Sequence, residues 1–129
     1  SSLLFGEEED PAKGQLHFIL KLSHEGQGLA LYYASRPAYQ KKVISYLSYQ
    51  VQEDVVIRGA EGKSYPALGV HYDPSYDAYG QTRLLITFDR AVLEEPTFEL
   101  CLNVPWFTSS MINFTFSSKA IRATPSLKS

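Results

Sequence analysis

The fold class of this chain is set by the segment Val55-Val-Ile-Arg-Gly-Ala-Glu-Gly-Lys-Ser-Tyr65. A run of three β-branched residues leads into Gly59-Ala-Glu-Gly62, whose glycines suit a hairpin turn. The chain then returns through Lys63–Tyr72, which we interpret as a second strand. A central β-hairpin favours an antiparallel β-protein.

The sequence on both sides of this hairpin predicts further short strands and almost no helix. Turn-forming residues separate them at intervals of roughly 8–15 residues, as in a β-sandwich. We therefore predict an all-β fold, an antiparallel immunoglobulin-like β-sandwich of seven or eight strands, with a small closed β-barrel as the alternative. The further strands are expected at Gln15–Lys21, Leu29–Tyr33, Thr82–Asp89, Thr97–Val104 and Met111–Phe116, with a half-strand at Ala120–Arg122.

One segment, from Ser35 to Gln50, is compatible with either a helix or a strand. As a helix, it aligns apolar residues at four-residue spacing: Tyr39, Val43 and Leu47. As a strand, it places on one face Val43, Ser45, Leu47, Tyr49 and Val51. Because β-branched residues and tyrosine favour strands, we predict a short turn or helical turn over Ser35–Gln40 and then a strand from about Lys42 to Val51.

Length and composition indicate one globular domain without a nucleic-acid partner. The chain has 129 residues, of which 44% are hydrophobic, enough to form a single core. Charged residues make up 20% and the formal net charge is −2. This balance lacks the basic footprint that nucleic acids and anionic membranes require.

Residues 1–14 are interpreted as an N-terminal acidic tether, and residues 15–129 as a single β-sandwich domain. The tether carries the acidic run Glu7–Asp10 followed by Pro11. The chain opens with Ser1 and no initiator methionine, which suits a tether behind a removed signal or lipid anchor, or an arbitrary chain boundary. No apolar run approaches the ~20 residues of a transmembrane helix. We expect an extracytoplasmic protein, secreted or held in the cell envelope.

The sequence offers no catalytic or metal-binding motif. Cys101 is the one cysteine, which excludes an internal disulfide, and its strand context favours a buried thiol over a nucleophile. The three histidines, His17, His24 and His71, do not show metal-ligand spacing. We therefore expect no enzyme, no cofactor and no metal.

The hairpin, the strand Leu84-Leu-Ile-Thr-Phe-Asp89 and the strand Ile112-Asn-Phe-Thr-Phe116 together resemble the telokin-like, immunoglobulin-like accessory domains of bacterial surface lipoproteins. The resemblance spans roughly residues 43–122 and includes a "Gly-Lys-x-Tyr" turn and a later "Phe-Asp" strand. It implies a binding or assembly module and supplies no catalytic residue. The connection Tyr72–Gly80 has no counterpart in that pattern.

That connection, Tyr72-Asp-Pro-Ser-Tyr-Asp-Ala-Tyr-Gly80, is the main candidate site. Because Pro74 and Gly80 oppose a regular helix, we predict a loop that displays phenol rings and carboxylates together. Sugar faces stack on such rings while carboxylates and amides hold their hydroxyls. The candidate ligand-binding residues are Tyr72, Asp73, Tyr76, Asp77, Tyr79 and Trp106, with Gln81 as a polar neighbour. The alternative is that Trp106 and some tyrosines pack the core or cap the end of the sandwich.

The resulting functional hypothesis is a non-enzymatic module that contacts a protein partner or a surface, through this loop or an exposed edge strand. A carbohydrate-binding module using Tyr72–Gly80 and a surface glycan is the alternative. Two weaker hypotheses use the pair Asp73 and Asp77, either as calcium ligands or as the two carboxylates of a small hydrolase.

Overall fold

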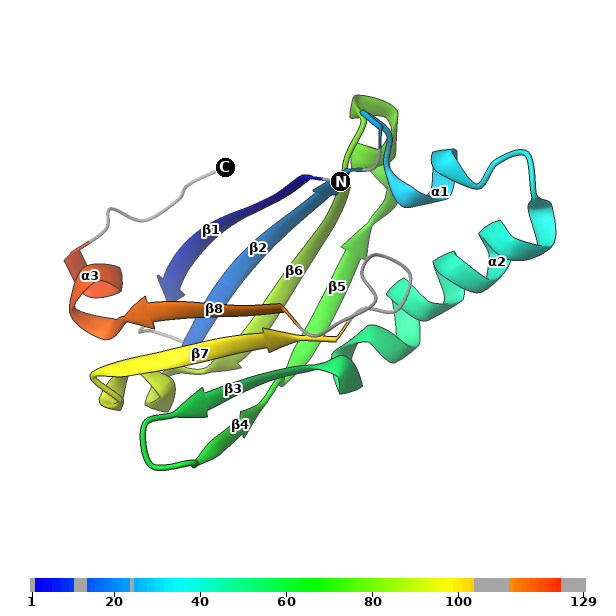
Figure 1. Cartoon of the computed structure of the whole chain (residues 1–129). Helices are drawn as coiled ribbons and strands as arrows, with labels where there is room; N and C mark the ends of the chain where they lie inside the picture. Colours follow the sequence, from blue (N-terminus) through cyan, green and yellow to red (C-terminus); the bar gives the residue numbers. More distant parts are fainter. Residues whose placement is uncertain (1, 11–13, 24, 104–111, 124–129) are drawn as a thin grey trace.

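A computed structural model describes residues 2–10, 14–23, 25–103 and 112–123. This part of the chain is mostly β and forms two antiparallel four-stranded sheets (Figure 1). The first sheet has the strand order β1-β2-β6-β5 and the second has the order β4-β3-β7-β8. The strands are β1 Ser2–Asp10, β2 Gln15–Ser23, β3 Val55–Gly59, β4 Ser64–Pro66, β5 Gly69–Asp73, β6 Thr82–Asp89, β7 Thr97–Leu102 and β8 Ile112–Ser117.

The core lies between the two sheets, where alternate residues of facing strands meet. The ring of Phe18 on β2 lies 6.3 Å from that of Phe98 on β7 and 5.3 Å from that of Phe116 on β8, between centroids. Within its own sheet it contacts Phe88 edge-on at 6.0 Å. Because the described strands of one sheet do not pair with those of the other, the arrangement is a sandwich and not a closed barrel.

The segment Lys63–Tyr72, predicted as one strand, is divided between the sheets. β4 pairs with β3, whereas β5 pairs with β6. The chain passes from one sheet to the other at Ala67 and Leu68, where the Leu68 amide donates to the Thr87 carbonyl at 2.7 Å. The predicted hairpin is confirmed, and its second strand is shorter than expected.

The prediction of a tether is wrong for Ser2–Asp10. This stretch forms β1, paired with β2 along its whole length from Ser2 opposite Ser23 to Asp10 opposite Gln15. β1 is an edge strand, and charged residues on edge strands discourage pairing with other chains. An acidic run is therefore compatible with a strand at this position.

The strands predicted at Leu29–Tyr33 and Lys42–Val51 are also wrong, because the connection between β2 and β3 is helical. It lies to one side of the sandwich (Figure 1). Val43, Leu47 and Val51 are all at most 1% exposed, so apolar side chains at four-residue spacing form a single buried face. The elements are α1 Leu29–Tyr32, α2 Pro37–Ser45, a π-helical turn η1 Tyr46–Gln50 and a 3₁₀ turn η2 Val51–Asp54.

Three further helical elements complete the described chain, of which the first is the 3₁₀ helix η3 Pro74–Tyr79 between β5 and β6. The 3₁₀ turn η4 Arg90–Glu94 precedes β7, and the helix α3 Ser118–Ala123 replaces the half-strand predicted at Ala120–Arg122. In the described residues, no helix is both long enough and apolar enough to cross a membrane.

Candidate functional site

The predicted loop is an ordered turn between β5 and β6. Its centre is the 3₁₀ helix η3, Pro74–Tyr79. The Asp73 carboxylate caps this helix by accepting hydrogen bonds from the Ser75 amide at 3.1 Å and the Ser75 hydroxyl at 2.6 Å. Gly80 ends it in the left-handed conformation, with φ of 80°. Proline and glycine thus exclude a longer helix, as expected, but the segment is helical over about two turns of 3₁₀ geometry.

Tyr72 and Asp77 point into the protein. Each is only 8% exposed, and the Tyr72 hydroxyl donates a hydrogen bond to Oδ2 of Asp77. Burial raises the pKa of Asp77, and the hydrogen bond from Tyr72 opposes this rise. Burial and the same hydrogen bond raise the pKa of Tyr72. Neither side chain offers a surface to a ligand in this conformation.

Asp77 rests against the start of the helical connection. Its Oδ1 has no hydrogen-bond partner within the described chain. A Cβ atom added at Gly28 would lie 2.6 Å from this Oδ1 and 2.9 Å from the carbonyl oxygen of Gln81. The Leu29 amide donates to the Thr82 hydroxyl at 2.6 Å, beside the same contact. These close approaches fix the base of η3 against the N-terminal end of α1.

Tyr76 and Tyr79 lie on the outer side of η3. The ring of Tyr79 is 80% exposed, and its centroid is 6.4 Å from that of the half-buried Tyr76. The Arg83 guanidinium carbon lies 4.2 Å from the centroid of Tyr76, a cation–π contact that joins β6 to η3. We refer to Tyr76, Tyr79 and Arg83 together as the tyrosine surface.

Tyr76 lines two hollows. The first, of about 210 Å³, is bounded by β5, η3 and β6. The second, of about 660 Å³, lies along η3 itself. Their linings are His71, Asp73, Tyr76, Arg83 and Leu85 for the first, and Ser75, Tyr76, Ala78, Tyr79 and Gln81 for the second.

The carboxylates of Asp73 and Asp77 have separate partners. The Ser75 hydroxyl and amide lower the pKa of Asp73, and the charges of His71 and Arg83 lower it further. Asp77 bonds to Tyr72 instead. Within the residues that the structure describes, no three His, Cys, Asp or Glu side chains are grouped closely enough to hold a metal ion.

Trp106, the remaining predicted ligand-binding residue, lies outside the described residues. The structure thus brings Tyr76 and Tyr79 together at the surface, uses Asp73 as a cap beside them, and buries Tyr72 and Asp77 beneath.

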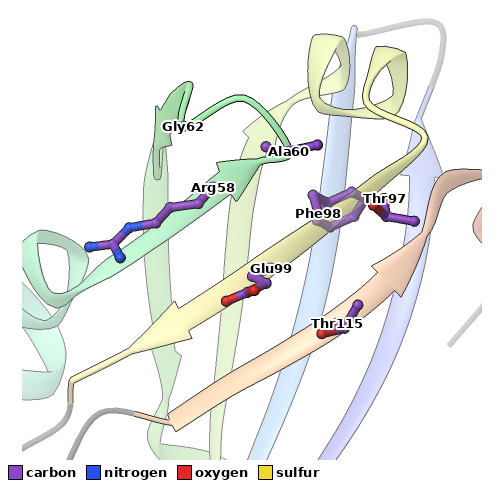
Figure 2. A pocket seen from close by; sticks show the side chains of 8 residues that line it. Arg58, Ala60, Gly62, Thr97, Phe98, Glu99 and Thr115 are labelled. Atoms are coloured by element: carbon purple, nitrogen blue, oxygen red, sulfur yellow. The ribbon is translucent and has the colours of Figure 1, made fainter.

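A further hollow, of about 360 Å³, lies on the outer face of the second sheet. Figure 2 shows Arg58, Glu99 and Thr115 on three adjacent strands, β3, β7 and β8. The hairpin turn around Gly62 borders it. Opposite charges on paired strands suit a solvated sheet face, and no exposed ring accompanies them here.

Cys101 lies on β7 and is 1% exposed. Burial raises the pKa of its thiol, which disfavours the thiolate that a nucleophile needs. This burial agrees with the prediction of a buried thiol at this position.

Arg83 and His71 were missed by the sequence analysis as members of the site. A signal was present in the strand pattern, because Arg83 alternates with the buried residues Thr82 and Leu84 and must point outward. The pairing of Asp73 with Arg83 across β5 and β6 then brings Arg83 to the loop.

Comparison with protein-family models, with curated proteins and with solved structures finds no match. The resemblance to accessory domains of surface lipoproteins therefore stays a prediction.

Proposed function

We propose that the chain is a non-enzymatic interaction module on an immunoglobulin-like sandwich. The strand order supports the immunoglobulin-like fold in this proposal. Immunoglobulin domains of the constant type have strands ABED in one sheet and CFG in the other. Lettered in chain order, β1-β2-β6-β5 corresponds to ABED and β3-β7-β8 to CFG, with β4 as an additional strand beside β3. The helical connection then falls between strands B and C.

The tyrosine surface is the proposed contact region. The observation that carries the proposal is the 80% exposure of Tyr79 on a turn whose inner side is held by the buried pair Tyr72 and Asp77. Exposed rings on an ordered turn lose little entropy on binding. Tyrosine and arginine are also the residue types most enriched where protein interfaces gain their affinity. A protein partner that covers Tyr76, Tyr79 and Arg83 fits these properties.

The proposed location is extracytoplasmic, in the cell envelope or secreted, with a lipid anchor as one means of attachment. Its support is the resemblance of the hairpin and of the two strands Leu84–Asp89 and Ile112–Phe116 to surface-lipoprotein domains. Fractionation of cells that produce the natural gene product tests it, since recovery in the cytoplasmic fraction alone contradicts this location.

Site-specific photo-crosslinking tests the contact region. A benzophenone amino acid at position 79 should capture a defined partner, whereas the same group at Lys119, on exposed α3, should not. The purified partner should then lose affinity for Tyr79→Ala by about tenfold or more. Equal capture from both positions, or unchanged affinity of Tyr79→Ala, contradicts the proposal.

Glycan binding is the second candidate function, favoured by the hollow of about 660 Å³ between the rings of Tyr76 and Tyr79 and the side chains of Ser75 and Gln81. Aromatic faces next to hydroxyl and amide groups suit a sugar ring. Affinity electrophoresis in gels that contain polysaccharides tests this function. Retardation of the wild type and loss of retardation in Tyr79→Ala support it, and equal mobility in all gels rejects it.

A further inference from the structure

We propose that the smaller hollow beside Tyr76 binds the carboxylate of an acidic sugar, with Arg83 as the principal contact. This inference rests on the second candidate function, glycan recognition, and specifies the class of glycan: an oligosaccharide that contains uronic acid.

Arg83 has hydrogen-bond donors that the protein leaves available to a ligand. Its guanidinium is stacked over the Tyr76 ring, 4.2 Å from the centroid. Within the described residues, no hydrogen bond from the guanidinium is found. Asp73 is its register partner on β5, and the charges of the two side chains interact. Stacking uses the faces of the guanidinium and leaves its N–H edges available. A planar fork of donors held in one orientation is suited to a carboxylate, which it can bind with two parallel hydrogen bonds.

Further basic side chains lie on the same face of the sheet as Arg83. Lys21 is its register partner on β2, so both side chains belong to the same outer face of the sheet. His71 borders the hollow from β5. Two cationic side chains and a histidine attract an anion to this face.

Asp73 narrows the choice of anion. Its Oδ1 accepts both hydrogen bonds from Ser75, which leaves Oδ2 to accept one from a ligand hydroxyl. A negative charge beside Arg83 disfavours a phosphate dianion more than a carboxylate monoanion, because repulsion grows with charge. The hollow therefore suits a ligand that combines one carboxylate with neighbouring hydroxyl groups, as a uronic acid does.

The smaller hollow is next to the larger one, which the exposed ring of Tyr79 lines. Tyr76 lines both hollows, and Tyr79 lines the larger one. An oligosaccharide whose acidic sugar binds Arg83 can place its next sugar over the ring of Tyr79. An acidic peptide also offers carboxylates, but it makes less use of a stacking face and a hydroxyl acceptor at one site.

Isothermal titration with two matched probes tests the proposal: a tetramer of galacturonic acid and a tetramer of galactose. The wild type should bind the acidic tetramer at least about tenfold more tightly, and Arg83→Leu should remove this preference. Arg83→Lys should retain part of it, because lysine keeps the charge and loses the fork. Arg58→Leu, on the outer face of the other sheet, is the matched control and should change nothing. Circular dichroism and the melting temperature verify that each variant is folded.

The outcomes separate the inference from the function on which it rests. If both tetramers bind equally and only Tyr79→Ala weakens them, the acidic specificity is wrong and glycan recognition stands. If neither tetramer nor any polysaccharide binds, both are wrong. If a hexaglutamate peptide binds through Arg83 as tightly as the acidic tetramer, the assignment to a sugar is overturned.

Discussion

The Tyr72 hydroxyl donates a hydrogen bond to Oδ2 of Asp77, five residues further along the chain. This contact joins the end of strand β5 to the middle of η3, and both side chains are buried. It therefore acts as the internal support of the turn whose outer side carries Tyr76 and Tyr79. A loop with this support presents its exposed rings in one arrangement.

Removal of this support by Tyr72→Phe should destabilise the protein by about 1–3 kcal/mol at neutral pH, because a buried carboxylate loses its donor. The loss should be smaller in acid, where Asp77 takes up a proton and a neutral carboxyl group tolerates burial better. Urea unfolding at several pH values measures both effects. Tyr79→Phe, at a ring that is 80% exposed, is the control and should change the unfolding free energy by less than about 0.5 kcal/mol. An equal loss for the two variants contradicts the role of Tyr72.

Asp77→Asn should alter the pH dependence of stability. Burial raises the pKa of Asp77 above its ordinary value of 3.8, so the folded state binds the proton more tightly than the unfolded state does. Stability of the wild type therefore falls as pH rises from 3.8 through the raised folded pKa, and this cost is fully present above that value. Asparagine does not ionise, so the stability of Asp77→Asn relative to the wild type should increase between acid and neutral pH.

Asp73→Asn is the control, and we expect its stability relative to the wild type to change with pH in the opposite direction. The pKa of Asp73 is lowered, chiefly by Ser75, so its contribution to stability is present above the ordinary value of 3.8 and is lost as pH falls below it. Its relative stability should therefore decrease between acid and neutral pH. Paired unfolding curves of the two variants that shift in the same direction would show that the sign assigned to Asp77 is wrong.

Gly28→Ala should destabilise the protein by about 1–3 kcal/mol, because the new methyl group meets Oδ1 of Asp77 at 2.6 Å and the backbone carbonyl of Gln81 at 2.9 Å. Gly28 has φ of −67°, so the cost comes from crowding and not from backbone strain. Gly69→Ala is the matched control, since no atom lies within 4 Å of its added Cβ. Thermal melting compares the two variants, and equal melting temperatures would contradict the close contact between α1 and η3.

Strands that alternate in polarity could be predicted from the sequence. β2 and β6 occur where predicted because each buries every second residue against the facing sheet, and β7 alternates in the same way until its last three residues, which are all buried. β1 could not be predicted, because an acidic edge strand has the composition of a solvated tether. The division of Lys63–Tyr72 could not be predicted either, since a crossing between sheets depends on which strand each half pairs with.

The candidate site could be predicted in position but not in orientation. Tyr72–Gly80 was the right segment to single out as a dense group of rings. Its side chains nevertheless divide, because the alternation of β5 turns Tyr72 inward, whereas 3₁₀ geometry turns Asp77 inward and Tyr79 outward. That division depends on packing against Gly28, which is distant in sequence. Local propensity carries no information about such a contact.

The helical connection allows a direct test of helix against strand. In a strand, Leu47 and Tyr49 would share one face and similar burial. In η1 they differ, because Leu47 is 0% exposed and Tyr49 is 82% exposed. Leu47→Ala should therefore lower the unfolding free energy by about 2–5 kcal/mol through loss of core packing. Tyr49→Ala, two positions away, should change it by less than about 0.5 kcal/mol. Comparable losses at both positions in denaturant unfolding would favour the strand instead, since only a two-residue period gives these side chains the same environment.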